Sequence, residues 1–304
     1  MIDIIGKKKW FFLLSLIVIV PGLISLLLWG LNPSIDFVGG SSIILDYKIP
    51  ISDQTKQLIS KTISSEKVEV STIQVSGNEA VIRTALMDTK THQLIINKLH
   101  SVTGSFSEGT FETIGPVISA EITRNAILAV LLASVLIVLF IAYAFRKVPK
   151  PASSWRFGVS AIAALLHDVL VLLGIFSILG HFFHVEVDSL FVTAVLTVIG
   201  FSVHDTIVVF DRIRENLRRL GGGSFSNVVN ASILQTLSRS LNTSLTVILV
   251  LIGLLLFGGQ STRWFIVALL IGVISGTYSS IFNAAPLLVL WQEWSERRSQ
   301  KKNK

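Results

Sequence analysis

The sequence of 304 residues contains no cysteine. Disulfide bonds, thiolate catalysis and cysteine-based metal sites are therefore excluded. Charged residues are also scarce, at 15% of the chain, whereas soluble domains contain about 25%. Hydrophobic residues make up 51% of the chain, and the mean hydropathy is positive. This composition is typical of an integral membrane protein.

Two further classes of protein are not expected. No stretch matches the phosphate-binding pattern G-x-x-x-x-G-K-[ST], so ATP hydrolysis within the chain is not predicted. Gly221–Gly223 is interpreted as a flexible turn, because no strand precedes it and no lysine follows. The net charge of +7 does not indicate a nucleic-acid partner, because Lys and Arg cluster at the ends of apolar runs, where they orient helices.

Six mostly apolar runs are long enough to cross a lipid bilayer as helices. Lys and Arg flank them mainly on one side, whereas the short loops 181–187 and 259–263 contain only Arg263. The positive-inside rule then places both termini in the cytoplasm. The predicted runs cover residues 10–31, 124–145, 156–180, 188–210, 239–258 and 263–291.

The predicted domains follow from these runs. Residues 1–31 form a cytoplasmic N-terminus and the first helix, and 32–123 form an exported domain between helices 1 and 2. Residues 124–291 contain helices 2 to 6 with a cytoplasmic loop at 211–238, and 292–304 form a basic cytoplasmic tail. Within the loop, 220–238 is predicted to be an amphipathic cytoplasmic helix that leads into the fifth span.

The exported domain is predicted to have an α+β fold. Its order β-α-β-β-α-β is that of a ferredoxin-like split βαβ unit. His92 and His100 lie eight residues apart on a polar helix, which is typical of a solvated face, and no metal site is expected. We interpret the domain as a binding or mechanical one. Strands are expected at 41–47, 68–75, 80–86 and 106–114, and helices at 52–64 and 88–100.

A stripe of small residues follows one face of the last span. Gly272 and Gly276 form a GxxxG pattern, which allows helices to approach closely. We favour packing within the chain over dimerisation for this stripe. Its members are Gly272, Ser275, Gly276, Ser279 and Asn283.

Ionisable residues inside the apolar runs are the candidate functional residues. A carboxylate in the middle of a spanning helix costs about 2.5–3.5 kcal/mol on insertion scales, so Asp205 is expected to face protein or water and to be functional. His204 lies beside it, and His167 and Asp168 lie near the middle of the third span.

Arg239 opens the fifth span and shares a helix face with Asn242, Thr243 and Thr246. If the fourth and fifth spans pack antiparallel, Arg239 and Asp205 lie at comparable depth. A carboxylate beside a guanidinium can hold its charge, and it is protonated when that partner moves away. We therefore predict a proton relay of Asp205, Arg239, His204 and Asp168, with protons as the coupling ion and no bound cofactor.

Several motifs resemble a known family. The stretch Gly200–Asn216, GFSVHDTIVVFDRIREN, resembles the fourth-span signature of SecF, a subunit of the bacterial Sec protein translocase accessory complex. The matching motifs occur in the family's order and cover nearly the whole chain. The others are Ile35–Ser41, Ile114–Pro116, His167–Val169 and Leu237–Thr243.

The resemblance implies a six-helix membrane protein that corresponds to half of an RND-superfamily transporter, with SecD as the other half. Such a complex uses the proton motive force across the bacterial plasma membrane to help pull preproteins from the SecYEG channel. The family's essential carboxylate corresponds to Asp205 and its basic partner to Arg239. His204 departs from the family pattern, in which Asn is more usual, and Asp168 has a structural or a secondary relay role.

Movement of the exported domain relative to the membrane helices would need hinges. Gly39, Gly40, Gly115 and Pro116 are the hinge candidates at the two entrances of the exported domain. The chain is not expected to be an enzyme, because no grouping for covalent chemistry is evident.

Three other functions stay open. An RND-type exporter of small molecules or lipids would carry two large exported domains, whereas one loop of suitable length is available here. An intramembrane aspartyl protease would use Asp168 and Asp205 as a carboxyl pair, but the Gly-x-Gly-Asp context is missing. In a passive membrane scaffold, the ionisable groups would only hold helices together.

Overall fold

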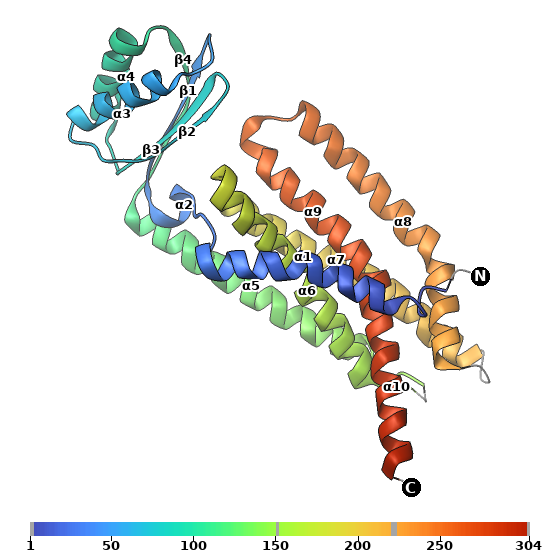
Figure 1. Cartoon of the computed structure of the whole chain (residues 1–304). Helices are drawn as coiled ribbons and strands as arrows, with labels where there is room; N and C mark the ends of the chain where they lie inside the picture. Colours follow the sequence, from blue (N-terminus) through green and yellow to red (C-terminus); the bar gives the residue numbers. More distant parts are fainter. Residues whose placement is uncertain (1–2, 150–151, 220–223, 303–304) are drawn as a thin grey trace. The chain divides into compact units, whose positions relative to one another are not determined.

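The computed structural model describes residues 3–149, 152–219 and 224–302. The predicted turn at Gly221–Gly223 and the last two residues of the predicted basic tail lie outside these ranges. The chain divides into two compact units, which are described separately (Figure 1). The helical unit comprises the chain up to Leu31, Leu128–Val185 and the chain from Leu190 onward, and the sheet unit comprises Asn32–Ile127 and Glu186–Ser189.

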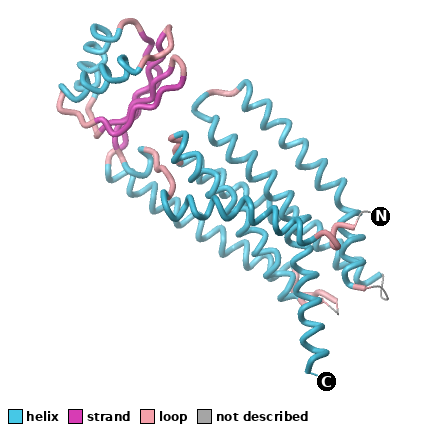
Figure 2. The backbone as a smooth tube through the Cα atoms, viewed as in Figure 1, coloured by secondary structure: helices cyan, strands magenta, loops and turns pink. Residues whose placement is uncertain are grey.

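Six long helical segments confirm the predicted number of candidate membrane spans. The last of them is interrupted by a π-helical turn, and a 3₁₀ turn at Gln260–Thr262 precedes it. Figure 2 shows how helix dominates the chain outside the sheet unit. The helices are α1 (Lys8–Trp29), α5 (Pro116–Ala144), α6 (Ser154–Phe183), α7 (Ser189–Arg219), α8 (Phe225–Phe257), α9 (Arg263–Ser279), the π turn (Ser280–Ala284) and α10 (Ala285–Lys302).

The predicted cytoplasmic loop at 211–238 is helical on both sides of residues 220–223, and a helix leads into the fifth span as predicted. Helix α7 continues to Arg219, and α8 begins at Phe225 and runs into the fifth span without a break. The Ser224 side chain caps α8 by accepting a hydrogen bond from the Asn227 backbone N–H. Buried apolar residues such as Val229 and Ile233 then hold the first turns of α8 against the protein.

The sheet unit has the predicted element order β-α-β-β-α-β. Its four strands pair antiparallel in the order β2-β3-β1-β4, and Ile43 of β1 lies opposite Ile82 of β3 and Phe111 of β4. Its elements are α2 (Ile35–Val38), β1 (Gly40–Tyr47), α3 (Asp53–Ser65), β2 (Val70–Ser76), β3 (Glu79–Thr84), α4 (Thr89–Thr103) and β4 (Phe106–Ile114).

The predicted placement of the sheet between helices 1 and 2 is corrected by the structure. The short helix α2 follows α1, so the sheet begins between α2 and α3. Ser34 starts α2 because its side chain accepts a hydrogen bond from the Asp36 N–H, and Gly39 ends it with a positive φ of 76°. Counted by candidate membrane spans alone, the strands lie between α1 and α5.

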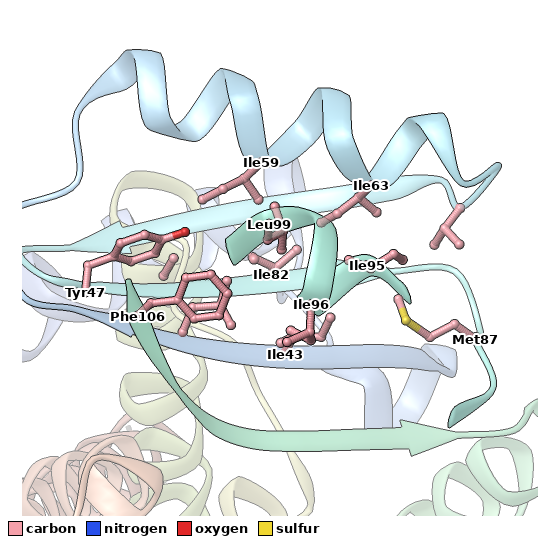
Figure 3. Close-up of a cluster of buried hydrophobic side chains, with 13 residues drawn as sticks. Ile43, Tyr47, Ile59, Ile63, Ile82, Met87, Ile95, Ile96, Leu99 and Phe106 are labelled. Carbon is pink, nitrogen blue, oxygen red and sulfur yellow. The ribbon is translucent and has the colours of Figure 1, made fainter. Parts of the chain in front are cut away.

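Helices α3 and α4 pack on one face of the sheet and bury its core (Figure 3). Ile59 and Ile63 of α3 and Leu99 of α4 point toward the strands, where Ile43 and Ile82 are fully buried. The predicted helix starts at residues 52 and 88 are confirmed, because the side chains of Ser52 and Asp88 accept hydrogen bonds from backbone N–H groups in the first turns of α3 and α4.

The prediction of a solvated face for His92 is wrong. His92 is buried, its ring stacks on Phe111 with a centroid distance of 3.8 Å, and its Nε2 lies 2.8 Å from Glu108 Oε1. The helix pattern suggested exposure because the covering residues come from β4, which lies later in the chain.

Glycine contacts set the helix spacing in the helical unit. A Cβ atom on Gly272 would lie 1.9 Å from Val198 Cγ2, and one on Gly276 would lie 3.2 Å from Ser202 Cα. The GxxxG pattern of α9 therefore packs against α7 within the chain, as predicted. A second close approach joins α1 and α6, where a Cβ on Gly174 would lie 2.7 Å from Gly22 Cα.

Candidate functional site

Asp168 of α6 is the most completely buried acid of the described membrane helices. Three serine hydroxyls donate hydrogen bonds to its carboxylate: Ser202 of α7 at 2.5 Å, Ser275 of α9 at 2.7 Å and Ser279 of α9 at 2.6 Å. Both oxygens are used, because Ser275 contacts Oδ1 and the other two contact Oδ2. Asp168 thus joins three helices, and its acceptor capacity is well filled.

His167 extends this network toward the N-terminal helix. Its Nδ1 lies 2.9 Å from Asp168 Oδ1, and its Nε2 lies 3.1 Å from Ser15 Oγ of α1. Ser15 in turn contacts the side chain of Asn283 in the π turn, with the amide nitrogen at 2.8 Å. A continuous chain of polar side chains therefore connects α1, the π turn and Asp168. π-Helical turns are frequent at functional sites.

Asp205 of α7 is buried in a different environment. The hydroxyl of Ser240 on α8 lies beside its carboxyl. However, neither Asp205 Oδ2 nor Ser240 Oγ makes a well-formed hydrogen bond to any described residue, although both atoms are buried. Such an unpaired buried oxygen is costly in a helix bundle, which is typical of a functional group rather than a packing device.

The structure does not pair Arg239 with Asp205 as expected, whereas the neighbouring His204 interacts electrostatically with the Asp205 carboxyl. Arg239 directly precedes Ser240, yet its side chain is exposed and forms no ion pair with any residue the structure describes. His204 is also exposed, because adjacent residues of a helix point about 100° apart and Asp205 takes the inward direction. Among the described residues, Asp205 and Arg239 therefore form no ion pair.

The serine residues that donate hydrogen bonds to Asp168 were not predicted from the sequence. Ser275 and Ser279 belong to the small-residue stripe that was interpreted as a packing surface, and their spacing of four residues places both hydroxyls on one face. The signal that could have identified them is the pairing of this stripe with an acid in another span. The stripe serves both purposes, because Gly276 lets α9 approach while its neighbours hold the carboxylate.

The hinge candidates lie at the predicted joints. Gly39 and Gly40 have positive φ values of 76° and 120° between α2 and β1, and a Cβ on Gly40 would lie 2.7 Å from the Thr84 carbonyl oxygen. Gly115 has open space at its Cβ position, and Pro116 is the first residue of α5. Gly40 is therefore confined by its neighbours, whereas Gly115 is not.

Among the residues that the structure describes, metal ligands do not gather. Across residues 3–149, 152–219 and 224–302, no group of three or more His, Asp or Glu side chains could hold a metal ion. The polar groups of the bundle suit the binding and release of protons, because they combine two buried carboxyls, an imidazole and several hydroxyls.

Comparisons with known proteins identify what the chain is similar to. Residues 94–294 match the family model described as protein export membrane protein SecD/SecF, C-terminal. A protein translocase subunit SecF of Thermobaculum terrenum is 46% identical over 314 residues, which covers 96% of this chain and 94% of that relative.

Two longer relatives match the chain over part of their length. The protein translocase subunit SecDF of Bacillus subtilis is 35% identical, and the match covers 98% of this chain and 39% of that protein. The crystal structure of SecDF from Thermus thermophilus, described as a translocon-associated membrane protein, superposes with a TM-score of 0.80 at 31% identity. The match covers 96% of this chain and 39% of the SecDF chain.

Proposed function

The chain belongs to the SecF family of protein translocase subunits, and we propose that it works with SecD as a proton-driven subunit of the Sec protein-export machinery. In this proposal it resides in the bacterial plasma membrane with both termini in the cytoplasm. It is a transport subunit without a site for covalent chemistry. Its coupling ion is the proton, and its further partners are the SecYEG translocon and preproteins.

The exposed polar face of α8 supports the need for a partner in the membrane. A guanidinium and three polar side chains that face lipid would be costly, so we propose that SecD covers them. The SecDF relative of known structure contains the equivalent of this chain in 39% of its length, which leaves most of that chain for other parts. The exposed residues of this face are Arg239, Asn242, Thr243 and Thr246.

The relay is proposed to run through the two buried acids. The observation that carries the proposal is the link through α7, where Ser202 donates to Asp168 and lies one helical turn before Asp205. Asp205, whose Oδ2 is unpaired, would be the proton-binding group, and Arg239 would approach it when the SecD complex changes conformation. A charge that crosses the whole membrane potential gains about 2.3 kcal/mol per 100 mV, enough to shift a two-state helix arrangement.

The sheet unit is proposed to be the exported, ferredoxin-like domain. The supporting observations are its strand order β2-β3-β1-β4 and its helices α3 and α4 on one face, as in a split βαβ unit. We propose that it holds preprotein segments on the outer side of the membrane and moves about Gly39, Gly40, Gly115 and Pro116.

Replacement of Asp205 by Asn tests the proposal. Membrane vesicles that contain SecYEG, SecD and this chain are given an imposed proton gradient, and preprotein export is followed. Asp205→Asn should lose the proton-dependent stimulation, because an amide takes up no proton at neutral pH. The matched control is Asp211→Asn on the same helix, since Asp211 is exposed and pairs with Arg214.

The outcomes separate the candidate functions. Normal stimulation with Asp205→Asn contradicts the relay. Loss of SecD binding in the same variant indicates a scaffold role instead. An altered resistance to small molecules without an export defect would point to the exporter function.

A further inference from the structure

The connection between α6 and α7 belongs to the sheet unit, although both helices belong mainly to the helical unit. The connector is Glu186–Ser189, and it clusters with Asn32–Ile127. The sheet unit is thus joined to the membrane helices at three places in the chain: before α2, through α5 and at this connector. The glycine joints lie within the sheet unit, after α2 at Gly39 and Gly40 and before α5 at Gly115, whereas the connector contains no glycine.

Backbone hydrogen bonds bind the connector to the segment after α1. The Val187 N–H donates to the Asn32 carbonyl and the Ser34 N–H donates to the Val187 carbonyl, both at 2.8 Å. These bonds form a parallel bridge between Pro33 and Val187. In addition, Asp36 Oδ2 accepts a hydrogen bond of 2.8 Å from the Ser189 N–H at the first turn of α7, where a carboxylate also favours the helix dipole.

One cation lies among the acids of this junction. Arg83 of β3 forms an ion pair with Glu186, and their side chains are only 17% and 8% exposed. Gln74 Nε2 donates a hydrogen bond of 3.1 Å to the other oxygen of Glu186. Burial lowers the pKa of Arg83 to about 10, while Asp36 and Asp188 act in the opposite direction. Arg83 is therefore charged at neutral pH, and its counter-ions come from α2 and from the connector.

We propose that Arg83 is a positioning residue that fastens the connector to the sheet, so that the sheet unit moves together with the adjoining ends of α6 and α7. These two helices carry Asp168 and Asp205. A rotation of the sheet unit about its glycine joints must then either move α6 and α7 or break the ion pair between Arg83 and Glu186. The functional part of this inference rests on the proposed function, whereas the attachment itself does not.

Hydrogen exchange tests the attachment independently of export. In the full-length chain with SecD, Arg83→Ala should speed exchange at the Ser34 and Val187 amides by about tenfold or more, because a buried charged hydrogen-bond partner is lost. The matched control is Lys98→Ala, which breaks the exposed Lys98–Glu66 pair of the same unit and should leave these amides unchanged. Equal protection in wild type and Arg83→Ala would overturn the proposal.

A disulfide tests the coupling. Pro33 and Val187 form a bridge, and bridged segments lie about 4.8 Å apart, which is within the range that a disulfide spans. Because the chain has no native cysteine, the double variant Pro33→Cys with Val187→Cys can form one disulfide within the chain. Arg83→Ala should lower export stimulation, and the oxidised pair should restore it without harming the otherwise wild-type chain. Unchanged export in Arg83→Ala, or a block of export by the disulfide alone, overturns the coupling.

Asp205→Asn separates this inference from the proposed function. This variant should be inactive while its connector amides exchange as in wild type. If Asp205→Asn remained active, the relay would fail, and the exchange result for Arg83→Ala would still decide whether the connector is fastened.

Discussion

Replacing Asp168 by alanine would remove the acceptor shared by three serine hydroxyls and the His167 ring. Ser279 has an alternative, because the Gly276 carbonyl lies 3.2 Å from its hydroxyl. For Ser202 and Ser275, the described part of the chain offers no second acceptor. A buried donor left unpaired costs about 1–3 kcal/mol, so Asp168→Ala should lower the free energy of unfolding by about 2–6 kcal/mol.

Asp168→Asn separates stability from proton transfer. Asparagine has nearly the same volume and keeps one carbonyl acceptor, and the serine hydroxyls can rotate to accept from its amide. The substitution should lower the free energy of unfolding by only about 1–2 kcal/mol, because a hydrogen bond to a charged group is stronger than a neutral one by about that amount. We expect this variant to fold and bind SecD, but to lose much of the proton-driven export stimulation, because its amide does not titrate.

Two measurements check this reasoning on the same preparations. Unfolding of the purified complex in lipid nanodiscs gives the stability, and export by vesicles with an imposed proton gradient gives the function. If Asp168→Ala is as stable as wild type, the serine network does not hold the helices together. If Asp168→Asn exports as well as wild type, Asp168 is a structural residue alone and only Asp205 is left to carry the relay.

Two further predictions concern packing and charge. Gly174→Ala would place a Cβ 2.7 Å from Gly22 Cα and should destabilise the α1–α6 contact by about 1–3 kcal/mol in thermal unfolding, whereas Gly253→Ala, which has open space, should be neutral or slightly stabilising. Glu79 lies opposite Asp46 in the sheet, and burial followed by this like charge raises the pKa of Glu79 above its ordinary 4.5. Glu79→Gln should therefore stabilise the sheet unit by about 0.2–1 kcal/mol at neutral pH, because the penalty on the ionised group grows as pH rises through the raised pKa. The gain should vanish at about pH 4, and an equal gain at both pH values would contradict this explanation.

The elements that depend on local physical chemistry could be predicted from the order of the residues. Apolar runs long enough for a bilayer predicted six spans, because a helix must satisfy its own backbone hydrogen bonds in lipid. Alternating and helical periodicities predicted the β-α-β-β-α-β order, and Ser52 and Asp88 marked two helix starts. Helix α8 continues from Phe225 through the fifth span without a break, because no residue between Phe225 and Arg239 breaks a helix.

Which side chains come into contact could not be predicted before the packing of the helices and the sheet was known. The hydroxyls on Asp168 come from positions 34, 107 and 111 residues away, and a one-dimensional pattern does not encode which helix faces turn toward each other. The same holds for Glu186, which lies in a short loop by sequence but forms an ion pair with a residue of β3. Burial and pairing are properties of several chain segments together, and so the exposed side chain of Arg239 and the filled carboxylate of Asp168 emerged only when the helices were packed.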